Sequence, residues 1–344
     1  MRYLIDLPVS SVQAIKLLIE SGKYENVQSF ALTAIENQLY LEKQPIEHFG
    51  SVEPCTIPCS QESGNSSPIP FLALRPALGI SDIVTVPEPS AETSNSDILW
   101  ALYNRIFPVK VALRVLANLQ KSNATDQGYI DLFAVTDAAA DVARKLSLLL
   151  SKVDKKSHRI HGEKLSTGLP GAGNRASERF KSSFVGTINS KGHIEGAPAV
   201  LRFVNIRRDG GGRPQIGITE SGFEFALLEN PILDKTDYSH TFYDEEIAFY
   251  IRHVSEKLQK EYQLSFNMLQ AIKNGNTTPD GLTKTVLEAS LDLSNKEAQA
   301  IRSSAVSRLS ELGMLTRRRN GLNVTYSLSA NARTLLATSI EKKE

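Results

Sequence analysis

The stretch SELGMLTRRRNGLNVTYSL, residues 310–328, determines how the C-terminal part of the chain is interpreted. An apolar run with helical spacing ends at Gly313, and Arg317, Arg318 and Arg319 follow it. Asn-Gly and an alternating apolar sequence come next, which predicts a β-hairpin with the arginines at its tip. Like charges at a tip cannot neutralise one another, so we expect solvent or a phosphate to face them.

The helix before this hairpin is marked at both ends. Ser294, with Glu297 three residues later, predicts a capping box at its start, and Gly313 predicts its end. Further helical patterns surround these elements at residues 244–262, 265–273, 281–289 and 330–340.

The order of three helices, strand, basic turn, strand and helix resembles a winged helix-turn-helix domain over about residues 264–338. The segment AIRSSAVSRLSELGMLTRRRNGLNVTYSLSANARTLL carries this resemblance. In that family the third helix lies in the major groove of DNA and the hairpin rests on a phosphate backbone or in the minor groove. The resemblance implies a recognition helix and an arginine wing, formed by Lys296, Gln299, Arg302, Ser303, Arg308, Arg317, Arg318 and Arg319. A solubilising turn without a partner is the alternative.

Upstream, residues from about 107 to 233 resemble a second, elaborated winged helix with a basic insertion at 152–174. Helical patterns at 97–107, 109–120, 136–153 and 176–188 precede two predicted strands at 197–206 and 213–219, and a short helix at 220–228 closes the unit. By this resemblance the DNA contacts are Arg175, Arg179 and Lys181 on the third helix, and Arg207, Arg208 and Arg213 on the wing.

An internal repeat supports two related units. QIGITESGFEFAL and TYSLSANARTLLA align at an offset of 110 residues, which pairs Ile218 with Leu328 and Thr219 with Ser329. Two copies are too few for a solenoid, so we expect a duplicated small domain.

The N-terminal segment resembles a ribbon-helix-helix domain, with RYLIDLP as the ribbon and helices at 9–22 and 26–42. The resemblance implies a homodimer formed through residues 1–42, since one copy buries too little apolar surface alone. Its dimerisation residues are Tyr3, Ile5, Leu7 and Phe30. The outward ribbon residues Arg2, Leu4 and Asp6 depart from the family's polar, often basic pattern, so the alternatives of dimerisation alone and of direct base reading stay open.

Charge is distributed unevenly along the chain. Residues 43–95 form a linker rich in Pro and Ser, within an acidic stretch that holds eight acids and two bases between Glu42 and Asp97. Between Arg144 and Arg213 there are fifteen Lys or Arg and five Asp or Glu, although the whole chain carries a formal charge of only +1. A basic block in a balanced protein predicts a surface that binds a polyanion, with a solvated basic surface as the alternative.

Enzymatic and metal motifs are absent from the sequence. Cys55 and Cys59 lack the further ligands of a zinc site, so we expect free thiols. The pattern H-R-I-H at 158–161 lies in a Gly-flanked basic loop, and GLPGAGNRAS lacks the lysine of a phosphate-binding loop. We expect no enzyme, no metal and no cofactor, place His193 and His253 at a surface or interface, and interpret residues 244–246 as acids that begin a helix.

The sequence therefore predicts a mainly α protein with small β elements (α+β), composed of domains at 1–42, 96–233 and 234–344 joined by the linker 43–95. No apolar run is long enough for a membrane span and the N-terminus lacks a signal-peptide pattern, so we expect a cytoplasmic protein. The first hypothesis is a dimeric transcriptional regulator that binds double-stranded DNA. The second is a non-enzymatic adaptor or structural subunit, with protein partners, in a larger nucleic-acid assembly for plasmid replication, partition, a mobile element or defence.

Overall fold

The computed structural model divides the chain into two compact units, Met1–Ser63 and Gly64–Glu344. The described residues are 83–89, 98–122, 127–160, 162–289, 293–321 and 323–341, with Lys16, Ile19, Glu20, Asn26 and Val27 in the first unit. The predicted dimerisation residues Tyr3, Ile5, Leu7 and Phe30, both cysteines and His161 lie outside them. The description below concerns the second unit.

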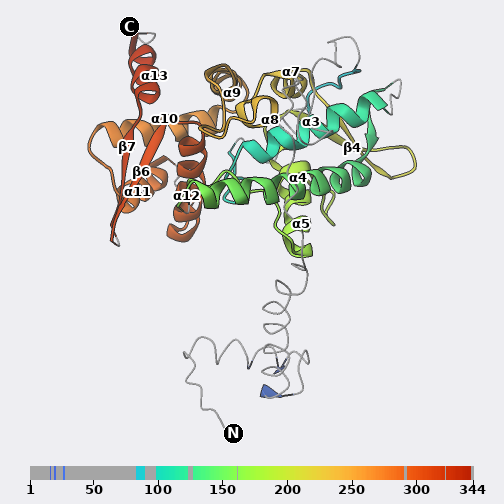
Figure 1. The fold of residues 1–344 in the computed structure, drawn as a ribbon, viewed down its shortest axis with the longest axis horizontal. Helices are drawn as coiled ribbons and strands as arrows, with labels where there is room; N and C mark the ends of the chain where they lie inside the picture. The colour runs from blue at the N-terminus through green and yellow to red at the C-terminus, as the bar shows by residue number, and fades with distance from the viewer. Residues whose placement is uncertain are drawn as a thin grey trace, which may run out of the picture. The chain divides into compact units, whose positions relative to one another are not determined.

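The described part of the second unit is mainly helical with small antiparallel sheets, which confirms the predicted α+β class (Figure 1). Its N-terminal half contains a three-stranded antiparallel sheet in the order β1-β5-β4. The elements of this half are α3 (Phe107–Ser122), β1 (Ile130–Asp131), α4 (Leu132–Lys156), α5 (Asn174–Phe180), β4 (Val204–Arg208), β5 (Pro214–Ile218) and α7 (Glu220–Leu227). A π-helix (Lys181–Val185) continues α5, and β2 (Thr187–Ile188), β3 (Ile194–Glu195) and α6 (Ala197–Val200) lie between it and β4.

The C-terminal half repeats this order with shorter connections. Its elements are α10 (Gln259–Lys273), α11 (Pro279–Ala289), α12 (Asn295–Glu311), the hairpin β6 (Leu315–Asn320) and β7 (Asn323–Leu328), and α13 (Ala330–Glu341). Helices α8 (Pro231–Lys235) and α9 (Asp244–Lys257) connect the halves. Because Leu258 leaves helical geometry (φ −131°, ψ 69°), the continuous pattern at 244–262 forms two helices, α9 and α10.

The internal repeat corresponds to the same local structure in both halves. Thr219 accepts a hydrogen bond from the backbone N–H of Gly222 and begins α7, and Ser329 accepts one from Ala332 at the start of α13, each at 3.2 Å. The N–H of Thr219 bonds to the carbonyl before β4, and that of Ser329 to the carbonyl before β6. The sequence offset of 110 residues therefore marks two copies of one strand-turn-strand-helix arrangement.

A second correspondence links each hairpin to the segment that precedes the second helix of its copy. Ile216 on β5 pairs with Ile130, and the N–H of Tyr326, 110 residues after Ile216, bonds to the carbonyl of Thr277 at 2.8 Å. The next residue, Asp131 or Thr278, accepts a hydrogen bond from the N–H three residues further on. We call these the first copy (α3 to α7) and the second copy (α10 to α13). One cluster of buried apolar side chains runs through both copies.

The helix predicted at 97–107 is not present. Residues 98–106 form an irregular strap, and α3 begins at Phe107, so Pro108 lies where its missing N–H is harmless. The strap's backbone bonds to remote carboxylates instead: Leu99 N–H donates to Glu261 at 3.0 Å, and Ile106 N–H donates to Glu311 at 2.5 Å. These bonds attach the strap to the second copy.

Candidate nucleic-acid interface

Helix α12 is the third helix of the second copy, and its sequence fixes both ends. The capping box forms as predicted, because Ser294 Oγ accepts from the N–H of Glu297 and the Glu297 carboxylate accepts from the N–H of Ser294. At the other end Gly313 adopts φ 64°, and the N–H of Met314 bonds to the carbonyl of Leu309 at 2.8 Å. The helix is therefore a rigid platform for its side chains.

The N-terminal half of α12 displays a polar face. Lys296, Gln299 and Ser303 are exposed, as the sequence predicts for residues that meet DNA. Arg302 is half-buried, and its Nη1 lies 3.5 Å from the Tyr326 hydroxyl on β7. Lysine and glutamine side chains on a helix can read base edges in a major groove.

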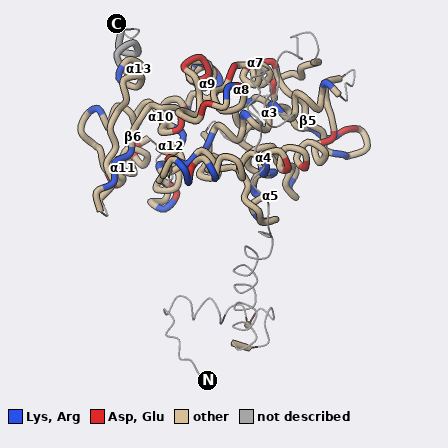
Figure 2. Tube along the Cα trace, viewed as in Figure 1, with Lys and Arg blue, Asp and Glu red and all other residues tan. Residues whose placement is uncertain are grey.

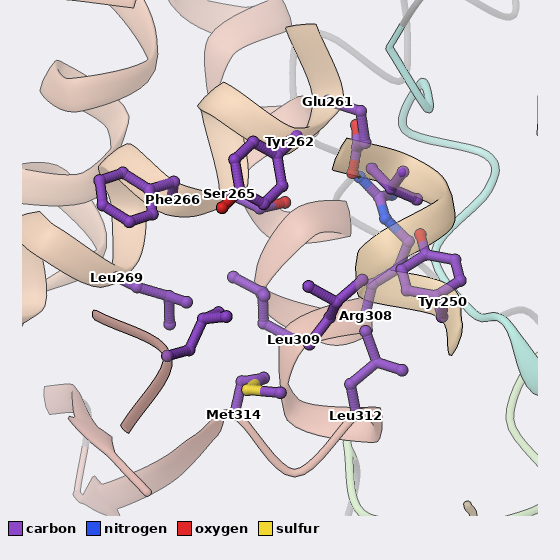
Figure 3. A pocket seen from close by; sticks show the side chains of 13 residues that line it. Tyr250, Glu261, Tyr262, Ser265, Phe266, Leu269, Arg308, Leu309, Leu312 and Met314 are labelled. Carbon is purple, nitrogen blue, oxygen red and sulfur yellow. Dashed lines mark hydrogen bonds and ion pairs between the residues drawn. The ribbon is translucent and has the colours of Figure 1, made fainter. Parts of the chain in front are cut away.

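Arg308 does not belong to this face, and its assignment to DNA contact is wrong. The side chain is 2% exposed, and its Nη2 forms an ion pair with Glu261 at 2.6 Å. Its Nη1 donates to Ser304 Oγ and to the carbonyl of Tyr103 in the strap, at 2.6 and 2.8 Å. Figure 3 shows the two charged groups meeting beside a small apolar cavity of about 40 Å³, which Leu309, Leu312 and Met314 also line. A guanidinium enclosed in this way stabilises the fold and is withheld from any ligand.

The hairpin β6–β7 forms as predicted, but its three arginines lie along strand β6 and not in the turn, which follows Asn320. Arg317, Arg318 and Arg319 are exposed, and none has a carboxylate within ion-pair distance in the described part of the chain. Arg319 Nε donates to the carbonyl of Gly321 at 2.9 Å, which closes the turn. Successive residues of a strand point to opposite faces, so Arg317 and Arg319 share a face and Arg318 lies on the other.

The loop 157–166, which follows α4, is built around the buried carboxylate of Asp154. That carboxylate accepts hydrogen bonds from the N–H groups of Leu165 and Ser166 and from Ser166 Oγ, at 2.7–3.1 Å. It also pairs with Arg159 at 3.3 Å. Burial raises the pKa of Asp154, but these hydrogen bonds outweigh it and hold the pKa below its usual value.

Arg105 of the strap attaches this loop to α12. Its Nη2 donates to the carbonyl of Gly162 at 2.7 Å, and its Nη1 lies 3.5 Å from the carbonyl of Ser307. A groove of about 400 Å³ lies between the loop and the second copy, lined by Gly162, Glu163, Ser307, Ser310, Arg317 and Arg319 among others. The insertion of the first copy thus forms a wall beside the wing of the second.

In the first copy the third helix keeps two of its three predicted cations free. Arg175 and Arg179 are exposed and line a groove of about 1010 Å³ beside the loop 167–173. Lys181 is mostly covered and bonds to Asp137 and Glu178 at 2.7 and 2.8 Å. Those hydrogen bonds raise the pKa of Lys181, so its charge is already neutralised within the protein.

The wing arginines of the first copy make contacts within the protein, and one of them, Arg213, is paired with a carboxylate. Asp209 pairs with Arg213 at 3.1 Å and accepts the N–H groups of Gly211 and Arg213, and these bonds lower its pKa. The Arg207 guanidinium lies over the Tyr129 ring, 3.7 Å from its centroid, and Arg208 donates to the carbonyl of Gly212 at 2.8 Å. All three predicted wing arginines therefore have partners inside the protein.

Charge is distributed unevenly over the unit (Figure 2). Acidic residues gather on α7 and in the first turn of α9, whereas lysines and arginines mark the end of α4 and β6. In Figure 1, α5, α12 and the tip of the β6–β7 hairpin extend to the same lower side of this unit. The sequence-based site omitted four exposed cations of α4 and its loop, Lys152, Lys155, Lys156 and Lys164. The basic block at 144–213 was the signal for them.

The described ranges contain no group of three His, Cys, Asp or Glu placed to hold a metal ion, and none of their helices has the length and apolar character to cross a bilayer. His253 is buried within the unit, which corrects its predicted surface or interface position: its Nε2 lies 2.6 Å from the carbonyl of Leu201, and burial lowers its pKa. Compared with protein-family models, curated proteins and solved structures, the chain has no match.

Proposed function

We propose that this chain binds double-stranded DNA through two winged-helix copies and acts as a dimeric transcriptional regulator. The observation that carries the proposal is the second copy's exposed cationic surface: Lys296 on α12 and Arg317, Arg318 and Arg319 on the adjoining hairpin have no carboxylate partner in the described chain. Clustered cations held on a rigid scaffold without internal counter-ions attract a polyphosphate.

The shape of this surface favours duplex DNA. Lys296, Gln299 and Ser303 occupy one face of a helix that is capped at both ends, and a helix of this kind fits the major groove. The hairpin beside it supplies charge without base specificity, as phosphate contacts do. Together they provide a reading element and a positioning element.

The first copy has the smaller part in this proposal. Its third helix offers Arg175 and Arg179, while its wing arginines already have internal partners. We assign it to phosphate contact beside the site that the second copy reads. Dimerisation rests on the ribbon-helix-helix resemblance of residues 1–42, and a two-fold dimer would require an inverted repeat in the DNA.

The test is binding of a random-sequence duplex, measured by fluorescence anisotropy between 50 and 300 mM salt, roughly the range in which phosphate contacts dominate. We expect the triple variant Arg317→Ala, Arg318→Ala, Arg319→Ala to lower the slope of log K against log salt by up to about 3. The matched control is the triple variant Arg207→Ala, Arg208→Ala, Arg213→Ala, for which we expect a smaller decrease in this slope. A parent protein that does not bind duplex DNA at the lowest salt would refute the function, and an unchanged slope in the first variant would refute the wing assignment.

A further inference from the structure

The groove beside the β6–β7 hairpin combines residues from both copies. Arg317 and Arg319 line it from β6, Ser307 and Ser310 from α12, and Gly162 and Glu163 from the loop after α4. A Cβ placed on Gly162 would lie 3.5 Å from Arg317 Nη1, so the loop and the wing are close neighbours. Arg318 does not line the groove.

The groove is electrostatically incomplete. It contains two guanidinium groups and the single carboxylate of Glu163, and no ion pair joins Glu163 to either arginine. Lys155 and Lys156, in the last turn of α4, and Lys164 are exposed within a few residues of its wall, and none has a carboxylate partner in the described ranges. An anion in the groove would supply the missing negative charge.

The wall is held in place before any ligand arrives. Asp154 fixes the loop from inside, and Arg105, only 5% exposed, joins the carbonyl of Gly162 to α12. A site whose walls are already fixed loses little entropy when it binds. This rigidity distinguishes the groove from a chance gathering of mobile lysines.

We infer that this groove holds a phosphodiester group of the bound nucleic acid, with Arg317 and Arg319 on one side and the loop on the other. Lys155, Lys156 and Lys164 then follow the same backbone away from the wing. The inference rests on the proposed function and adds to it, because it makes the first copy's insertion part of the second copy's DNA contact. One backbone strand thereby connects the two copies.

The experiment measures duplex binding against salt for single and paired variants of the full chain. We expect Arg317→Ala and the pair Lys155→Ala, Lys156→Ala each to weaken binding roughly tenfold at 0.1 M salt and to lower the slope by about 1 to 2. Arg318→Ala, on the opposite face of the same strand, is the matched control and should change binding less than Arg317→Ala. Glu163→Gln, which removes the one carboxylate, should strengthen binding.

The outcomes separate this inference from the proposed function. If the parent binds DNA but the lysine pair and Glu163→Gln leave its affinity unchanged, the inference is wrong and the function stands. If the parent does not bind DNA, both fail. A free phosphate ion is the other ligand that could occupy the groove, and titration with inorganic phosphate and with pyrophosphate tests it. If these ions bind in a way that requires Arg317 and the protein does not bind DNA, the groove is a site for free anions and the inference is overturned. Circular dichroism of each variant confirms that a loss is not unfolding.

Discussion

The two hairpins of the second unit share a register and a following helix, yet their arginines lie in different surroundings. In the β4–β5 hairpin Asp209 pairs with Arg213, and Tyr129 covers Arg207. In the β6–β7 hairpin Arg317 and Arg318 have no carboxylate partner in the described chain. The difference lies in Arg213, which pairs with a carboxylate, and in Arg207, which lies over a ring; Arg208 is exposed and donates to a carbonyl, as Arg319 does. The number of cations in a hairpin therefore says less about its unpaired charge than the acids and rings around it.

The third helices differ in a related way. The C-terminal half of α12 is fixed by Arg308 and Glu311, which hold the strap, whereas its N-terminal half is free. In α5 the cations at both ends are exposed, and only Lys181, in the π-helix that follows, is paired. The second copy thus divides one helix between a half that is held by internal contacts and a half whose polar side chains are exposed.

Replacing Arg308 tests this division and should have the largest effect. Arg308→Ala leaves Glu261 buried without its partner, so we expect a loss of about 3–5 kcal/mol in the free energy of unfolding, measured by urea denaturation. Arg302→Ala, six residues earlier on α12, is the control and should lose about 1 kcal/mol or less. Equal losses in the two variants would contradict the division of α12.

The helices that close the two copies give the next largest contrast. A Cβ on Gly222 would lie 2.0 Å from the carbonyl oxygen of Phe203, while the equivalent Ala332 fits with its methyl group buried. We expect Gly222→Ala to lose about 3 kcal/mol through overpacking, and Ala332→Gly to lose about 1–2 kcal/mol through helix propensity and lost burial. A neutral Gly222→Ala would mean that α7 can move away from the strand without penalty.

The loop present only in the first copy adds a pH-dependent term. The folded-state pKa of Asp154 is lowered, so its carboxylate stabilises the fold above the unfolded value and this contribution fades as pH falls through the folded value. We expect Asp154→Asn to lose about 2–3 kcal/mol at pH 7, and the difference from the parent to shrink below about pH 4. Asp141→Asn, which breaks an exposed pair on α4, is the control and should cost roughly 0.5 kcal/mol. A difference for Asp154→Asn that does not change with pH would contradict the role of its charge.

Local signals in the sequence were sufficient for much of this fold. The capping box at Ser294, the turn at Gly313 and the arginine hairpin each depend on residues within a few positions, and all are present. The repeat at an offset of 110 residues also paired Thr219 with Ser329, which have the same role at the start of a helix in the structure. These features depend on short-range rules and so can be read from one sequence.

The failures have long-range causes. Helical periodicity alone turns Arg308 away from the face of Gln299 and Ser303, but the partner that holds it in the interior, Glu261, is 47 residues away. The strap has helical apolar spacing, but carboxylates more than 160 residues distant take its backbone N–H groups. The loop that carries Lys164 joins the candidate site because Arg105 binds it to α12. Contacts of this kind cannot be deduced from periodicity or charge counts.

The smallest expected effect tests the difference between the hairpins most directly. Asp209→Asn keeps an oxygen that can accept the N–H groups of Gly211 and Arg213 but removes the charge that pairs with Arg213. If the ion pair with Asp209 is what keeps Arg213 from contacting a DNA phosphate, this variant should bind duplex DNA up to about tenfold more tightly. The slope of log K against log salt should then rise by about 1. The double variant Asp209→Asn, Arg213→Ala should return to the parent's affinity, because the released cation is then gone. An unchanged affinity in Asp209→Asn would mean that the first wing stays clear of the DNA backbone, and that position rather than pairing separates the two hairpins.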